Sequence, residues 1–259
     1  MFFFDFVLEI RFMIYSELLL LSEYVVFDVD NSSSSRPLCR VRNGNLYPAI
    51  LLVNKQVHDE AIRLLYRNNC FQFPDIHSAQ SGRDSALIAP FLCQIGPQAS
   101  FIRHIYITFP TFNNYDDFLN NIATVDESFI GNLKLIRDKC SHITTLELLL
   151  RADRLNYVLN SKSAIARDTL DLLSALFTAI LPLTEIIIDF RVKDDQELYN
   201  LNDLSEVIKK MRQYKWSVNV TKLPKSIWRS DDGRASFSGE DGEEACNRYN
   251  RGQSFLCNY

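Results

Sequence analysis

Histidine and cysteine are the side chains with the widest chemical repertoire, and both are sparse in this sequence. None of them shows the His-Glu-x-x-His or paired Cys-x-x-Cys spacing of metal sites. Cys70 and His77 come nearest to a ligand pair, and a buried thiol beside a loop histidine explains them more simply. The spacing therefore predicts no metal site and no cofactor. The residues concerned are His58, His77, His104, His142, Cys39, Cys70, Cys93, Cys140, Cys246 and Cys257.

Nucleophile and phosphate-binding motifs are also missing from the sequence. It contains no Gly-x-Ser-x-Gly elbow and no phosphate-binding glycine loop. The acid pairs Asp116-Asp117 and Asp194-Asp195 each precede an expected helix, where carboxylates interact favourably with the positive end of the helix dipole. We interpret them as helix caps. No catalytic residue is predicted, and an unrecognised enzyme is the most remote hypothesis.

Composition and charge narrow the class of protein. The 259 residues are 47% hydrophobic and 23% charged, which is typical of a soluble globular protein of one large or two small domains. A net charge of -4 predicts no nucleic-acid partner. Charged residues interrupt the apolar N-terminus and the stretch 18–29, so we expect no signal peptide and no membrane span. Scattered cysteines indicate reduced thiols and an intracellular location, cytoplasmic or nuclear.

The first 75 residues predict two helices around a β-hairpin. Ile10, Ile14, Leu18 and Leu21 recur at helical spacing over residues 9–21. Residues 24–29 and 38–41 read as strands, and Asn54 caps a second helix that extends to about residue 66. A strand over 70–73 follows. We expect Arg11 to pair with Asp59 or Glu60 and so to hold the two helices together.

Residues 84–228 predict a series of β-α units. A helix over 84–95 ends at Gly96-Pro97, and residues 102–107, 143–148 and 183–188 then share apolar residues at their first, fourth and sixth places. Amphipathic helices lie between these segments, with stripes that include Ile122, Val125 and Phe129 in one and Leu172 and Leu173 in the next. Another helix and a strand near 216–220 complete the series. Residues 229–259 are rich in glycine and acids and predict a disordered tail.

Strands joined by long helices run parallel, so the expected fold class is α/β with a mainly parallel sheet. The spacing of 41 and then 40 residues between the three segments fits an irregular, leucine-rich-repeat-like array. A single α/β domain whose units only look alike is the alternative.

Two ordered blocks carry a resemblance to a known family. Glu9-Ile10-Arg11-Phe12-Met13-Ile14-Tyr15 followed by Leu18-Leu19-Leu20 resembles the opening of fungal F-box-like proteins. Leu51-Leu52-Val53-Asn54-Lys55-Gln56-Val57-His58-Asp59-Glu60-Ala61, with Asn69 and Phe71-Gln72-Phe73, is similar to the second helix and strand of that family. The resemblance covers roughly residues 4–110. Val7 stands where the family usually has proline, and the hairpin is an insertion.

The resemblance implies a protein-interaction role, as a substrate adaptor of a cullin-type ubiquitin ligase. Its protein partners would be a Skp-type adaptor and an unknown client. A stand-alone interaction or structural protein of F-box descent, without a ligase role, is the alternative. The candidate adaptor contacts are Phe12, Ile14, Tyr15 and Leu18. Loops after the expected repeat strands supply the candidate client contacts, which are Asn113, Asn114, Tyr115, Arg151 and Arg154.

Overall fold

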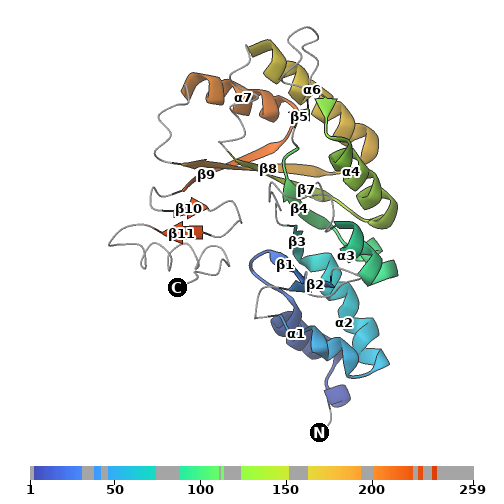
Figure 1. Ribbon diagram of the computed structural model, residues 1–259. Coiled ribbons are helices and arrows are strands. Elements are labelled where there is room, and N and C mark those ends of the chain that lie inside the picture. The colour runs from blue at the N-terminus through green and yellow to red at the C-terminus, as the bar shows by residue number, and fades with distance from the viewer. Residues whose placement is uncertain are drawn as a thin grey trace.

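A seven-stranded sheet forms the centre of the molecule, in strand order β2-β1-β3-β4-β7-β8-β9 (Figure 1). β2 pairs antiparallel with β1, and the other six strands run parallel. The fold is therefore α/β, as the sequence predicts. The strands are β1 (Val25–Asp30), β2 (Leu38–Val41), β3 (Cys70–Gln72), β4 (His104–Thr108), β7 (Thr145–Arg151), β8 (Glu185–Lys193) and β9 (Ser217–Leu223).

The structure is a computed structural model of the 259-residue chain. It describes residues 3–30, 38–41, 46–73, 88–110, 112–113, 124–151, 163–193, 201–223, 227–229 and 235–237. Two further strand pairs lie apart from the main sheet: β5 (Phe112–Asn113) with β6 (Thr124–Val125), and β10 (Ile227–Arg229) with β11 (Ala235–Phe237). β11 lies within the segment 229–259, for which the sequence predicts a disordered tail, and most of that segment lies outside the described residues.

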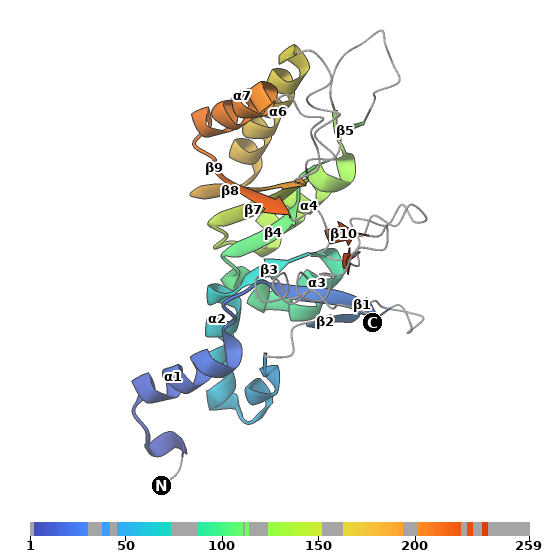
Figure 2. The same cartoon turned by 90° about the vertical axis from the view of Figure 1, so that its left-hand side faces the viewer.

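Helices cover one face of the sheet and lie beside the end of the sheet that is formed by β1 and β2. Figures 1 and 2 show α3, α4, α6 and α7 on one face, with α1 and α2 at the end that carries β1 and β2. Short 3-10 helices precede α1, α2 and β4. The helices are α1 (Leu8–Leu19), α2 (Lys55–Asn68), α3 (Ile88–Ile95), α4 (Glu127–Lys139), α6 (Ser163–Ile180), α7 (Leu201–Gln213), η1 (Phe3–Asp5), η2 (Pro48–Leu52) and η3 (Gly96–Phe101).

The register of the parallel strands confirms that the three expected segments are equivalent. Ile105 lies opposite Leu146, which lies opposite Ile186, and the next apolar positions follow the same pairing. The start of each strand also repeats a hydrogen bond. Thr144 Oγ1 donates to the carbonyl of Arg103 at 3.2 Å, and Thr184 Oγ1 donates to the carbonyl of Thr144 at 3.1 Å. Successive β-α units thus begin with the same local contact.

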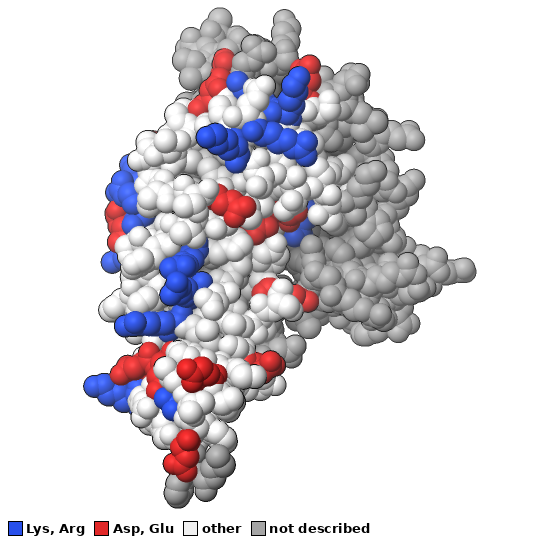
Figure 3. Space-filling view, turned by 180° about the vertical axis from the view of Figure 1, so that it is seen from behind, with Lys and Arg blue, Asp and Glu red and all other residues white. Residues whose placement is uncertain are grey.

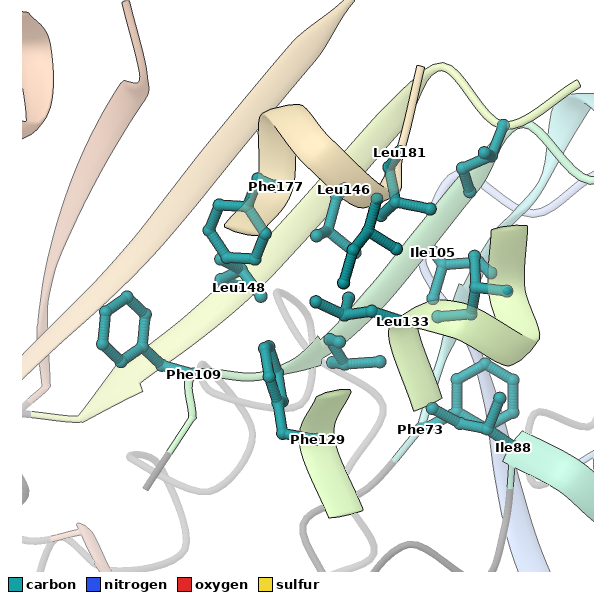
Figure 4. Packing of buried hydrophobic residues seen from close by; sticks show 14 of the residues in the cluster. Phe73, Ile88, Ile105, Phe109, Phe129, Leu133, Leu146, Leu148, Phe177 and Leu181 are labelled. Carbon is teal, nitrogen blue, oxygen red and sulfur yellow. The ribbon is translucent and has the colours of Figure 1, made fainter. Parts of the chain in front are cut away.

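The main core lies between the sheet and the helices that cover it (Figure 4). Leu133 from α4 and Phe177 from α6 pack over strand residues such as Leu146, and all three are at most 1% exposed. Burying a large aliphatic or aromatic side chain contributes roughly 1.5–3 kcal/mol. This layer of apolar contacts fixes which face of each strand the helices cover.

Two helical stripes differ from the sequence prediction. α4 begins at Glu127 because the Asp126 side chain accepts a hydrogen bond from the Ser128 amide at 2.8 Å, so Val125 lies in β6 and not on the helix. In α6, Leu172 is 41% exposed, and the buried side carries Leu170, Leu173 and Phe177. The helix is rotated so that Phe177 can contact Phe129 and Trp216.

The sheet continues across the expected boundary between the front end and the repeat region. β3 pairs directly with β4, although the sequence suggests separate domains ending at 75 and beginning at 84. The front helices nevertheless have a small core of their own. It consists of Tyr15, Leu19, Leu51, Val57, Ala61, Ile62 and Leu65.

Candidate functional site

The two front helices are joined by the ion pair that the sequence predicts. The Arg11 guanidinium donates to both carboxylate oxygens of Glu60, at 2.8 and 3.0 Å, and the Tyr15 hydroxyl donates to the same carboxylate at 2.9 Å. The hydrogen bond from Arg11 holds the pKa of Glu60 at about 2, and burial raises the pKa of Tyr15 to about 12. A bidentate arginine contact also fixes orientation, so α1 is held in one position on α2.

Asn69 ties the C-terminal ends of the same two helices together. Its side-chain amide donates to the carbonyls of Leu19 at 2.7 Å and Leu65 at 2.8 Å, and its Oδ1 accepts from the Leu21 amide at 2.9 Å. Asn69 is 1% exposed. Buried backbone groups at helix ends need such partners, so this one side chain completes the contact between α1 and α2.

α1 buries a different side from the one expected. Tyr15 and Leu19 are fully buried, whereas Ile10 is 39% exposed. The reason is that Arg11 and Tyr15 must face Glu60, which turns the expected stripe of isoleucines partly outward. Among the candidate adaptor contacts, Phe12 is exposed, Ile14 and Leu18 are half-buried, and Tyr15 belongs to the core and not to the surface.

The first half of α1 and its N-cap residue Val7 expose several apolar side chains. These residues, together the α1 surface, include Met13 at 64% and Val7 at 63% exposed. Glu9 and Glu17 are also exposed on this helix. η2 packs against α2 beside α1 and adds two exposed apolar residues, Leu52 and Val53. The α1 surface consists of Val7, Leu8, Ile10, Phe12 and Met13.

A polar cluster occupies the sheet face opposite the main core. Because side chains alternate along a strand, the positions between the core residues of β3, β4 and β7 all point to this other face. They place Cys70, His104 and Glu147 together, with the Cys70 thiol, a His104 ring nitrogen and a Glu147 carboxylate oxygen within 4.8 Å of one another. His104 Nε2 lies 3.0 Å from Glu147 Oε2, and the Tyr24 hydroxyl donates to Glu147 Oε1 at 2.9 Å.

A second buried group continues this polar cluster along β4 and β8. The Tyr106 hydroxyl donates to Asp189 at 2.6 Å, and Arg191 donates to both Asp189, at 2.9 Å, and the Tyr106 oxygen, at 3.1 Å. The rings of Tyr24 and Tyr106 lie 4.7 Å apart and link the two groups. Asp189 and Arg191 are 7% and 5% exposed. Each buried charge therefore needs the opposite charge of the other residue to offset its lost hydration.

Burial favours the neutral form of the tyrosine hydroxyls and of the thiol in this cluster, because it raises their pKa values. It raises the pKa of the Tyr24 and Tyr106 hydroxyls, and the neighbouring carboxylates of Glu147 and Asp189 act in the same direction. Burial, together with the charge of Glu147, also raises the pKa of the Cys70 thiol. A thiol held in its neutral form is a poor nucleophile, so this arrangement does not favour cysteine-based catalysis.

The sequence prediction did not identify this cluster. His104 and Glu147 stand 43 positions apart, and local motifs cannot detect such a pair. The alternation of apolar and polar residues within the segments 102–107 and 143–148 is the signal that could have identified the cluster. In these segments His104, Tyr106 and Glu147 are polar or amphipathic residues that stand between core positions. His77, which with Cys70 comes nearest to a ligand spacing in the sequence, lies outside the described residues.

The candidate client contacts are only partly within the described residues. Asn113 lies in β5, and Arg151 is the last residue of β7. Asn114, Tyr115 and Arg154 lie outside the described residues, as do the acid pairs at 116–117 and 194–195. Figure 3 shows basic and acidic residues in small separate groups on the face it presents, with uncharged surface between them.

Comparison of the chain with protein-family models, with curated proteins and with solved structures gives no significant match. Within the described ranges, none of the helices combines the length and the apolar character that crossing a membrane requires.

Proposed function

We propose that this chain is a non-enzymatic protein-interaction module that docks a helix of a Skp-type adaptor through the α1 surface. In this role it would serve as an F-box-like substrate adaptor of a cullin-type ubiquitin ligase. The observation that carries the proposal is the exposure of five apolar residues, four in the first half of α1 and Val7 directly before it, on a helix that is already packed against α2.

The exposed residues do little for the chain's own stability. Tyr15 and Leu19 supply the packing of α1, and Arg11 and Asn69 supply its polar contacts. Met13, at 64% exposed, gains little from burial within this chain. Exposed apolar side chains gathered on one short segment favour a protein-binding site. The α1 surface is thus both accessible and rigidly held.

The residue types on and beside the α1 surface indicate what kind of partner it would bind. Apolar residues one turn apart, such as Leu8 and Phe12 or Ile10 and Met13, fit the apolar face of an amphipathic helix, which is a common docking mode. Exposed Glu9 and Glu17 on the same helix favour lysine or arginine beside that apolar face. A Skp-type adaptor is the partner that the resemblance of residues 9–20 to F-box-like proteins suggests.

A binding assay between the purified chain and a fungal Skp-type adaptor tests the proposal. Met13→Asp changes the most exposed residue of the α1 surface without touching the core. We expect it to weaken binding at least ~10-fold, which corresponds to about 1.4 kcal/mol. Leu172→Asp is the matched control, because Leu172 is a 41% exposed leucine on α6, away from α1. It should leave the affinity unchanged.

Three results would refute the proposed docking: no binding by the folded wild-type chain, full binding by Met13→Asp, or equal losses in Met13→Asp and Leu172→Asp. Circular dichroism of each variant establishes that it is folded. A wild-type chain that folds but does not bind the adaptor would leave an interaction protein of F-box descent without a ligase role.

A further inference from the structure

We propose that Cys70, His104 and Glu147 form a binding site for a zinc ion. The three residues come from neighbouring parallel strands and project from the sheet face opposite the main core. One potential ligand atom from each lies within 4.8 Å of the others. The site is independent of the α1 surface, which lies on the front helices.

The side-chain types select the metal. Thiolate sulfur, imidazole nitrogen and carboxylate oxygen together are the ligand set of zinc, whereas magnesium and calcium prefer oxygen ligands alone. Zinc holds such atoms at roughly 2.0–2.3 Å, which places tetrahedral ligands about 3.3–3.8 Å from one another. The present separations, all within 4.8 Å, must shorten by about 1–1.5 Å at most to reach these values. The 3.0 Å contact of His104 with Glu147 is already close to them.

The strands supply a rigid frame for the ligands. Cys70 and His104 are direct partners in the register of β3 and β4, and Glu147 lies one strand farther, opposite Tyr106. Their spacing is therefore set by the backbone ladder and not by a loop. The hydrogen bond from the Tyr24 hydroxyl to Glu147 Oε1 orients the carboxylate from outside the ligand set. Such supporting partners are a regular feature of metal sites.

Solvent, and therefore a metal ion, can reach the candidate zinc site. The His104 side chain is 29% exposed, whereas the Glu147 side chain is 6% exposed. Three protein ligands leave a fourth tetrahedral position for water or another small ligand. Binding would displace the Cys70 proton to solvent and leave a zinc-bound thiolate.

The test is titration of the metal-free full chain with Zn²⁺ by calorimetry, and with Co²⁺ by absorption spectroscopy. We expect one ion per chain and, with Co²⁺, a thiolate charge-transfer band. Cys70→Ser should abolish that band and weaken Zn²⁺ binding more than ~10-fold, and His104→Gln should weaken it similarly. Tyr24→Phe, which removes the supporting hydrogen bond to Glu147, should weaken binding by roughly 10–100-fold.

Cys93→Ser and His142→Gln are the matched controls, since both residues are exposed and lie outside the cluster. Neither should change the affinity or the spectrum. The proposal is overturned if the wild-type chain binds no stoichiometric Zn²⁺, or if Cys70→Ser keeps the cobalt band and the wild-type affinity. Cys70→Ser changes a single atom, so its spectrum decides the question even if a bulkier change should unfold the chain.

Discussion

Replacing Asn69 with leucine tests whether one buried side chain joins the front helices. The change keeps the number and branching of the side-chain heavy atoms but removes three hydrogen bonds, leaving two carbonyls and one amide of the backbone without their partner. A neutral hydrogen bond contributes about 0.5–1.5 kcal/mol net, and an unsatisfied buried group costs about 1–3 kcal/mol. We therefore expect Asn69→Leu to lower the free energy of unfolding by roughly 3–5 kcal/mol.

The neighbouring residue provides the control. Asn68 is exposed at the end of α2, so Asn68→Leu should change stability by less than about 0.5 kcal/mol. Urea unfolding measured by circular dichroism gives both values. The fluorescence of Trp216, which is buried in the main core, shows whether the sheet unfolds together with the helices. For a chain of this size, a 3 kcal/mol loss corresponds to about 6–12 °C in Tm.

The outcome that would contradict this reasoning is an Asn69→Leu variant as stable as Asn68→Leu. The three contacts would then make no net contribution to folding, and the packing of Tyr15 and Leu19 would be sufficient to hold α1 on α2. A third variant, Asn69→Asp, keeps the acceptor for the Leu21 amide but turns a carboxylate oxygen toward two backbone carbonyls. It should be at least as destabilising as Asn69→Leu near neutral pH.

Two further changes test the charged contacts. The pKa of Glu60 lies at about 2, below its ordinary 4.5, so the ionised carboxylate stabilises the fold above pH 4.5 and this contribution is lost as pH falls from 4.5 towards 2; acid-unfolding curves of Glu60→Gln should lack that component. Arg191→Met should cost about 3–5 kcal/mol because Asp189 would remain buried without its cation. In urea unfolding, the double variant Arg191→Met, Asp189→Leu should lose less free energy of unfolding than Arg191→Met alone. An equal or larger loss in the double variant would show that the uncompensated charge of Asp189 is not the cause.

Periodicity predicts the core face of the sheet well because the physical signal is local. Alternating apolar residues placed Ile105, Leu146 and Ile186 in equivalent strand positions, and the register confirms this. The cap at Asn54 was also predictable, since its Oδ1 accepts from the Val57 amide three residues later. Both features depend only on residues close in sequence.

The candidate site was less predictable because it depends on tertiary contacts. The rotation of α1 follows from Glu60 on another helix, so the periodicity of α1 alone indicated the wrong buried residues. The cluster of Cys70, His104 and Glu147 forms only when three strands are aligned side by side. No spacing rule for a single segment contains that information, whereas aligning the polar positions of successive units would have placed His104 and Glu147 on one face.

The order of the parallel strands in space is also their order along the chain. From β3 to β9, each pairing joins residues 30 to 41 positions apart. At roughly 5–20 residues per second, a ribosome releases such a unit in about 2–8 s. Each strand can therefore join an edge that already exists when it is made. The growing sheet needs no later segment to complete an earlier pair, so this part of the protein can fold during its own synthesis, one unit after another.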